Sequence, residues 1–378
     1  MGKIDISLFI SVILLTLFGL FIIYDASSFV AYRDFSDKYH YIKDQFFWVA
    51  LGVGLLIFFS MFDYHKLYLL SIPILCTALI LLILVFVPGI GVRLLGANRW
   101  INLGAFVLQP AEFVKLALAI YLSAWFSNKE KGRLLAFLLI LGLVLFLVLM
   151  EPDMGTAAVI LSEALAIYFL SGANVFYYVL LAPILFVLGL IIIKVSPYRA
   201  ERLQAFLNID QSISTSSYHV KQALIALGAG GLTGVGLGNS LQKYAYLPES
   251  ATDSIFAIIA EELGFIGATG LILVFVFIVW RCFRIAVSAK DEFGRLLASG
   301  IATFLAVQAV INLGSQTALI PLTGIPLPFL SYGGSALIVD LCSIGILLNI
   351  SKQGLGTNIQ RSVYRSRKTR RQAVITKR

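Results

Sequence analysis

Long apolar runs dominate the chain and alternate with short polar segments. Each run is continuous over about 20 residues, the length that crosses the hydrocarbon core of a bilayer as a helix. The alternation of apolar and polar positions that marks membrane barrel strands is absent from these runs. We predict an all-α polytopic membrane protein with ten transmembrane helices, at about 7–26, 45–62, 67–87, 108–126, 134–150, 155–171, 174–194, 254–281, 295–319 and 330–350.

Composition agrees with this pattern and divides the chain in two. Of 378 residues, 59% are hydrophobic and 13% are charged, whereas about 25% are charged in soluble domains. The net charge is +9, and the segment 351–378 alone carries nine Lys and Arg residues and no acid. We expect a membrane domain over 1–350 and a basic cytoplasmic tail over 351–378, whose cations suit anionic lipid headgroups rather than nucleic acid.

The distribution of Lys and Arg predicts the orientation in the membrane. With the N-terminus inside, the inner segments collect 18 of the 29 basic residues, so both termini are predicted to be cytoplasmic. The protein is then a multi-pass protein of the cytoplasmic (inner) membrane. A large extracytoplasmic loop, 195–253, joins the seventh and eighth spans. Its amphipathic stretch Tyr218–Leu227 is predicted to lie on the membrane surface.

A glycine-rich segment, 231–253, ends this loop and leads into the eighth span. Asp253 is its last residue, and it has two readings. It can cap the following helix, or it can be a partly desolvated general base with a raised pKa. Glu261 and Glu262 lie deeper in the same span, where a charge is expected to face a cavity or an ion-pair partner.

Other polar residues stand at or within the spans. Glu112 and Lys115 share one face of the fourth span, as a pair that fixes helix registry or lines a polar cavity. Arg99 and Lys243 lie in external segments, where a cation binds phosphate or anchors the chain at the interface. Asp153 belongs to a polar break, Glu-Pro-Asp, between two short spans, either a plain turn or part of a polar cavity.

Four segments resemble those of the SEDS family, the shape, elongation, division and sporulation proteins that include FtsW, RodA and SpoVE. The resemblance covers everything except the tail. Its segments are Ala97-Asn-Arg-Trp-Ile-Asn-Leu-Gly104 with Gln109-Pro-Ala-Glu-Phe-Val-Lys115; Glu151-Pro-Asp-Met-Gly-Thr156; Gly236-Leu-Gly-Asn-Ser-Leu-Gln-Lys243 through Tyr246–Asp253 and Ala260–Gly267; and Pro321–Ser335.

The resemblance implies a ten-helix fold with an external active site. It also implies a peptidoglycan glycosyltransferase that polymerises lipid II and releases undecaprenyl diphosphate. The proposed catalytic aspartate of the family falls on Asp253, its Glu–Lys pair on Glu112 and Lys115, and its loop arginine on Arg99. The motif Gly-Asn-Ser-x-Gln-Lys resembles that of the FtsW/SpoVE branch and favours a role in cell division.

The sequence departs from the family pattern at three positions. Val107 replaces a basic residue, Thr323 replaces a lysine, and Ser254 replaces an aromatic residue after Thr-Asp. Phosphate contacts at the first two positions therefore do not carry over, and the departures weaken the assignment to division rather than elongation.

Combined with the residues above, the resemblance predicts an inverting mechanism. Asp253 would deprotonate the C4 hydroxyl of the acceptor N-acetylglucosamine, which attacks C1 of the donor N-acetylmuramic acid. Arg99 and Lys243, or a divalent cation such as Mg²⁺ or Mn²⁺, would neutralise the diphosphate. Asp153 and Glu249 complete the predicted substrate-binding set, with Glu112 and Lys115 ordering the floor of the cavity.

The expected partners are a class B penicillin-binding protein, which is a transpeptidase, and other proteins of division or elongation complexes. Three alternatives stay open at this point. The chain could be a flippase for lipid-linked precursors, a scaffold that only recruits a transpeptidase, or an elongation-type protein like RodA.

Overall fold

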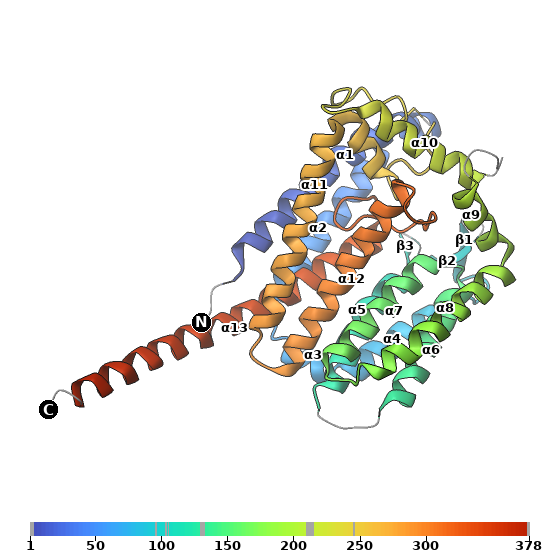
Figure 1. Cartoon of the computed structure of the whole chain (residues 1–378). Helices are drawn as coiled ribbons and strands as arrows, with labels where there is room; N and C mark the ends of the chain where they lie inside the picture. The colour runs from blue at the N-terminus through green and yellow to red at the C-terminus, as the bar shows by residue number, and fades with distance from the viewer. Residues whose placement is uncertain are drawn as a thin grey trace.

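The computed structural model describes residues 4–94, 97–102, 104, 106–128, 133–208, 215–244 and 246–375. Helices make up almost all of the described chain (Figure 1). In chain order the elements are α1 (Ile6–Phe35), α2 (His40–Met61), α3 (His65–Leu69), α4 (Ser71–Leu84), β1 (Gly91–Leu94), β2 (Ala97–Asn102), β3 (Val107–Leu108), α5 (Pro110–Phe126), α6 (Leu134–Met150), α7 (Met154–Leu170), α8 (Phe176–Val195), α9 (Pro197–Leu207), α10 (Thr215–Gly230), α11 (Ile255–Ser288), α12 (Glu292–Gln316) and α13 (Gly334–Ile375).

Every predicted span coincides with a helix, and the third coincides with the pair α3 and α4. In the described part of the chain, six helices are long and apolar enough to cross a membrane: α1, α2, α8, α11, α12 and the first half of α13. The helices α4, α6 and α7 are apolar but shorter. The prediction of an all-α polytopic membrane protein is confirmed, and the count of ten spans stays a prediction.

The helices differ sharply in how deeply they are buried. In the most apolar 18-residue stretch of α13, within Gly334–Gly354, 94% of the residues are buried, whereas in the corresponding stretch of α8 the share is 6%. The first half of α13 is therefore the central helix of the bundle, where it contacts α2, α5, α11 and α12. The large apolar side chains of α8 point outward, an arrangement that is stable only where lipid replaces water.

A small antiparallel sheet is the exception to the all-α architecture. Its strand order is β1-β2-β3, with Val92 opposite Trp100 and Ile101 opposite Leu108. The sheet lies immediately before α5, which begins at Pro110, so the predicted span at 108–126 starts two residues later than expected. Its second strand carries Arg99 toward the turn between α6 and α7.

The long loop predicted at 195–253 contains two helices, α9 and α10. The amphipathic stretch Tyr218–Leu227 lies within α10, whose inner face packs on α11. That face consists of Ser217, His219, Val220, Ala223, Ala226 and Gly230, all buried. The backbone of the predicted tail continues α13 as a helix to Ile375, which projects away from the bundle (Figure 1).

The helix α11 is interrupted at Gly264, whose φ of 66° and ψ of −168° are not helical. The glycine-rich loop pairs with this break. The N–H groups of Val235 and Gly236 donate to the carbonyls of Glu261 and Glu262, each at 3.0 Å, and the N–H of Phe265 donates to Gly231 O at 2.9 Å. These bonds replace the missing helical ones, because unpaired backbone groups are costly in an apolar surrounding.

Glycine is required where this loop meets the helix. A Cβ on Gly234 would lie 2.0 Å from the carbonyl oxygen of Glu262, and a Cβ on Gly264 would lie 2.2 Å from the backbone nitrogen of Gly234. Both glycines also have positive φ, which disfavours other residues. The glycine pattern therefore lets two backbones approach and holds the loop against α11.

Candidate active site

Asp253 lies in the turn that leads into α11, and its side chain is almost completely buried. The helix begins at Ile255 with Ser254 at its N-cap, so Asp253 is not the capping residue. The backbone carbonyl of Asp253 accepts a hydrogen bond from Asn312 Nδ2 at 2.8 Å, and the hydroxyl of Thr252 approaches its Oδ1 at 3.4 Å. The turn is thus fixed from α12 while the carboxyl group has weak local partners.

The surroundings of Asp253 tune it toward proton transfer. Burial raises its pKa from 3.8 to about 6, and the positive charge of Arg202 opposes that rise. Glu249 stands on the same turn with a φ of 50° and accepts from Thr252 Oγ1 at 2.8 Å. Desolvation, followed by the charge of Asp253, raises the pKa of Glu249. A carboxylate with a pKa near 6 can accept a proton at neutral pH.

A histidine that the sequence interpretation passed over borders the same turn. His219, from α10, lies within hydrogen-bonding distance of the Ser254 hydroxyl. Burial lowers its pKa to about 4, so its ring is neutral at pH 7. The contact joins α10 to the start of α11. Because His219 is neutral at pH 7, Asp253 is the group of this turn whose pKa lies near 6.

The turn between α6 and α7 carries Asp153 and is contacted by Arg99 of β2, two of the predicted substrate-binding residues. Arg99 donates from Nε to the carbonyl of Glu151 at 3.0 Å and from Nη2 to the carbonyl of Pro152. Asp153 caps α7 by accepting from the N–H of Thr156 at 3.0 Å. These contacts are structural, and the predicted substrate-binding roles of Arg99 and Asp153 stay predictions.

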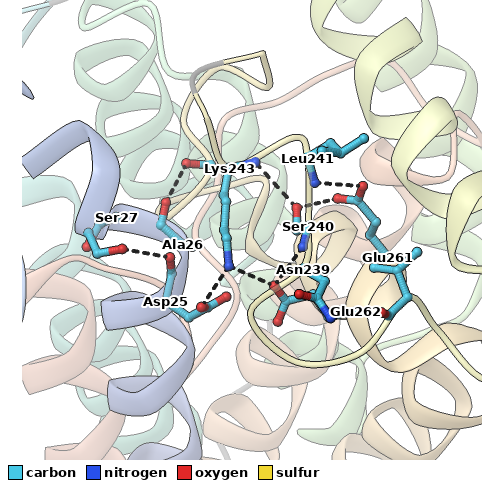
Figure 2. Close-up of polar contacts among 12 residues, drawn as sticks. Asp25, Ala26, Ser27, Asn239, Ser240, Leu241, Lys243, Glu261 and Glu262 are labelled. Carbon is cyan, nitrogen blue, oxygen red and sulfur yellow. Dashed lines mark hydrogen bonds and ion pairs between the residues drawn. The ribbon is translucent and has the colours of Figure 1, made fainter.

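Lys243 lies in a buried ionic network rather than at an open surface (Figure 2). Its Nζ lies 2.8 Å from Asp25 Oδ1 and 3.2 Å from Glu262 Oε1. Ser240 N donates to the same Glu262 oxygen at 3.2 Å, and the Ser240 hydroxyl donates to Glu261. Of the alternatives for Glu262, a cavity or an ion-pair partner, the structure shows the ion pair. The ammonium of Lys243 already has two carboxylate partners, so its proposed contact with diphosphate stays a prediction.

Glu112 and Lys115 form the expected pair, with Lys115 Nζ 2.8 Å from Glu112 Oε2 and both side chains 1% exposed. Lys115 also donates to Gln308 Oε1 at 2.6 Å. Two further buried acids, Glu163 of α7 and Asp340 of α13, interact electrostatically with Lys115. One ammonium therefore faces three carboxyl groups in the centre of the bundle.

Hydrogen bonds connect this buried cluster to the turn that carries Asp253. Gln308 uses its amide oxygen for Lys115 and its amide nitrogen for the carbonyl of Pro326, at 3.0 Å. One turn along α12, Asn312 donates to both Ile325 O and Asp253 O at 2.8 Å. The 325–326 segment is thus held by two amides of α12: Gln308, which also binds Lys115, and Asn312, which also binds the turn of Asp253.

Four charged residues of these sites escaped the sequence interpretation as site residues. Asp25, Glu163 and Asp340 are single acids within or at the end of apolar runs, and an ionisable residue in a membrane segment is by itself a signal of a site. Arg202 lies in the predicted external loop 195–253. Its signal was the pair of arginines, three residues apart, in Pro197-Tyr-Arg-Ala-Glu-Arg202.

A divalent cation is the predicted alternative to Arg99 and Lys243 for neutralising the diphosphate. Within the described ranges, no group of three or more His, Cys, Asp or Glu side chains is arranged to hold a metal ion. The charged group that acts on Asp253 most strongly is the guanidinium of Arg202. Mg²⁺ is usually held by one or two carboxylates together with substrate phosphates and water, so the divalent cation stays a prediction.

Comparison with known proteins identifies the family. Residues 5–355 match the family of FtsW, RodA and SpoVE, which is described as "Cell cycle protein". The chain is 40% identical over 355 residues to stage V sporulation protein E of Bacillus subtilis, covering 92% of this chain and 97% of that protein. It is also 40% identical over 359 residues to the probable peptidoglycan glycosyltransferase FtsW of Trichlorobacter lovleyi, covering 93% and 94%.

Two solved structures share the fold. One, described as "Structural coordination of polymerization and crosslinking by a peptidoglycan synthase complex", matches with a TM-score of 0.75 and 27% identity over 92% of this chain and 97% of that one. The other, the rod shape determining protein RodA of Thermus thermophilus, matches with a TM-score of 0.69 and 27% identity over 93% and 97%. The chain therefore belongs to the FtsW/RodA/SpoVE family of multi-pass proteins of the bacterial cytoplasmic membrane.

Proposed function

We propose that this protein is a peptidoglycan glycosyltransferase that polymerises lipid II at the outer face of the cytoplasmic membrane, with Asp253 as its general base. The observation that carries the proposal is the buried carboxyl of Asp253, whose pKa lies near 6 at the entrance of α11. Similarity over more than 90% of the chain to probable peptidoglycan glycosyltransferases supports the reaction class.

The proposed step transfers one glycosyl group. Asp253 takes the proton of the acceptor C4 hydroxyl while that oxygen bonds to C1 of the donor N-acetylmuramic acid. The bond from C1 to the diphosphate oxygen breaks, its electron pair leaves with undecaprenyl diphosphate, and Asp253 ends protonated. Attack from the side opposite the diphosphate inverts the configuration at C1. The outgoing diphosphate gains negative charge, so nearby cations stabilise the transition state.

We also propose the ten-span topology with both termini in the cytoplasm. The spans would be α1, α2, α3 with α4, α5, α6, α7, α8, α11, α12 and α13. The excess of Lys and Arg on the inner segments supports this orientation. It places Asp253, the small sheet and the helices α9 and α10 together on the outer side.

A division-type role and a transpeptidase partner complete the proposal. The 40% identity to an FtsW protein and to a sporulation protein of the same family supports the division-type branch. The related solved structure described as a complex of polymerization and crosslinking supports a partner that crosslinks strands. A class B penicillin-binding protein is the partner that fits this description.

The test uses purified full-length protein, labelled lipid II and a candidate class B penicillin-binding protein. Asp253→Asn should abolish glycan strands, because asparagine keeps the size of the side chain and loses its basicity. Asp34→Asn is the matched control, since Asp34 is an exposed external acid paired with Arg33. Near-normal polymer from folded Asp253→Asn protein would contradict the base assignment, and lipid II transport without polymer would favour a flippase.

The pH profile of the wild-type protein provides a second test. A general base acts only when ionised, so the polymerisation rate should rise with pH through about 6 and level off above it, following the pKa of Asp253. The folded pKa lies above the ordinary value of 3.8. The contribution of Asp253 to stability is therefore largest below about pH 4 and is lost as pH rises through 6. A flat rate between pH 5 and 8 would argue against this base.

A further inference from the structure

The guanidinium of Arg202, on α9, lies beside Asp253 across the loop that contains Gly324. A Cβ on Gly324 would lie 3.7 Å from Asp253 Oδ2 and 3.8 and 3.9 Å from Arg202 Nη1 and Nη2. These are its nearest atoms, at ordinary van der Waals distances, and the φ of Gly324 is +74°. The Cβ position of Gly324 therefore lies between the carboxylate of Asp253 and the guanidinium of Arg202.

Arg202 is fixed in orientation but keeps donors free. Its Nη1 donates to the carbonyl of Leu322 at 3.0 Å, and its guanidinium carbon lies 4.6 Å from the ring centre of Tyr198. Its Nε is buried without a hydrogen-bond partner. Its Nη2 has no partner among the residues that the structure describes. The edge formed by Nε and Nη2 is one that forks onto two oxygens of a phosphate or carboxylate.

The positive charge of this region is not neutralised by local ion pairs. Within the described chain, no carboxylate lies within ion-pairing distance of Arg99, Arg199 or Arg202. Arg199 donates to the carbonyl of Leu149 at 2.7 Å, and burial, followed by the charge of Arg99, lowers its pKa. Burial and the charge of Asp153 raise the pKa of Glu151 to about 9, so this nearby acid is neutral at pH 7.

We infer that Arg202 binds the diphosphate of the polyprenyl-linked substrate through its Nε and Nη2, next to the base Asp253. The inference rests on the proposed function and adds the residue that holds the leaving group. A lipid-linked diphosphate supplies the anion that this unpaired fork requires, and it can reach the site from the bilayer. Arg202 then has two effects: it stabilises the departing diphosphate, and its charge keeps Asp253 more acidic than burial alone would.

The first experiment measures binding of undecaprenyl diphosphate to the full chain in nanodiscs, independently of polymerisation. Arg202→Gln should weaken binding by about tenfold or more, the value of one charge-assisted fork, and Arg202→Lys should weaken it less. Binding of undecaprenol, which lacks phosphate, should not change. Arg284→Gln is the matched control, because Arg284 lies near the far end of α11, with its guanidinium carbon 4.9 Å from the ring centre of Trp280. Thermal unfolding of each variant shows whether it is folded.

The second experiment measures the pH profile of polymerisation. Loss of the charge in Arg202→Gln should move the midpoint to higher pH, whereas a purely structural role would lower the amount of active protein and leave the midpoint in place. Arg202→Lys keeps a positive charge and should keep a midpoint closer to that of the wild type.

The outcomes separate this inference from the proposed function. Equal affinity of folded wild-type and Arg202→Gln protein for undecaprenyl diphosphate would overturn the inference, even if both polymerise lipid II. Competition by phosphatidylglycerol as strong as by undecaprenyl diphosphate would also overturn it, because the fork would then serve general lipid headgroups. If the wild-type protein binds undecaprenyl diphosphate but makes no polymer, and Arg202→Gln weakens that binding, the diphosphate site is supported and the glycosyltransferase function is not.

Discussion

Two buried lysines in this protein, Lys243 and Lys115, are both paired with carboxylates, but their surroundings differ in exposure. Lys243 reaches from a loop to two carboxylates, Asp25 and Glu262, and Asp25 keeps 17% of its side chain exposed. Lys115 lies within α5, where its partner Glu112 is 1% exposed and two further acids, Glu163 and Asp340, are near. The first cluster has contact with solvent, and the second is enclosed by helices.

The difference indicates separate tasks for the two lysines. The Lys243 cluster joins a loop to α1 and α11, and backbone bonds between the loop and α11 share that task. The Lys115 cluster is connected to the turn of Asp253 through Gln308 and the 325–326 segment, which Asn312 also holds. Removal of Lys115 should therefore disturb both the bundle and the site, whereas removal of Lys243 should act mainly on the loop.

The largest expected effect is that of Lys115→Ala. It leaves Glu112 with no cation in the bundle centre, and breaking a buried pair costs about 3–5 kcal/mol. Unfolding in detergent should show this loss together with loss of polymerisation. The double variant with Glu112→Ala should lose less than the sum of the single variants, and strict additivity in this double-mutant cycle would show that the two residues do not interact.

A smaller effect is expected for Lys243→Ala. Charged hydrogen bonds contribute about 1.5–3 kcal/mol. The partly exposed carboxylate of Asp25 can be rehydrated, and the buried carboxylate of Glu262 keeps the N–H of Ser240 as a donor. Unfolding measurements should place this variant between wild type and Lys115→Ala. Lys43→Ala, which removes an exposed lysine paired with Asp37, serves as the comparison. A loss in Lys243→Ala that equals the loss in Lys115→Ala would remove the distinction between the clusters.

The smallest change, and one of opposite sign, is expected for Asp340→Leu. Both oxygens of Asp340 are buried without hydrogen-bond partners, and replacing an unsatisfied buried polar group with an apolar one of similar size is neutral or stabilising by about 1 kcal/mol. The melting temperature in detergent should stay the same or rise. A clear fall would mean that Asp340 is a required partner of Lys115, and the Lys115 cluster would then depend on all three acids.

Local sequence information was sufficient for the helices and for part of the site. The apolar runs placed the helices outside the 195–253 loop, because a segment in lipid must satisfy its backbone by itself. The spacing of Glu112 and Lys115 predicted their pairing, since residues three apart share a helix face. Local sequence information did not predict the break in α11 at Gly264, because that break depends on backbone hydrogen bonds with a loop about 30 residues earlier.

By itself, the sequence determined the membrane class, the family, the basic tail and Asp253 as the candidate base. Only the tertiary structure decided which charges meet. In the folded chain Lys243 donates to Asp25, which is 218 residues away, and Arg202 and Asp253 both lie beside Gly324. The tertiary structure also added Glu163 and Asp340 to the neighbourhood of Lys115. The physical reason is that spacing along one helix fixes its own faces, whereas contacts between helices depend on how the whole bundle packs.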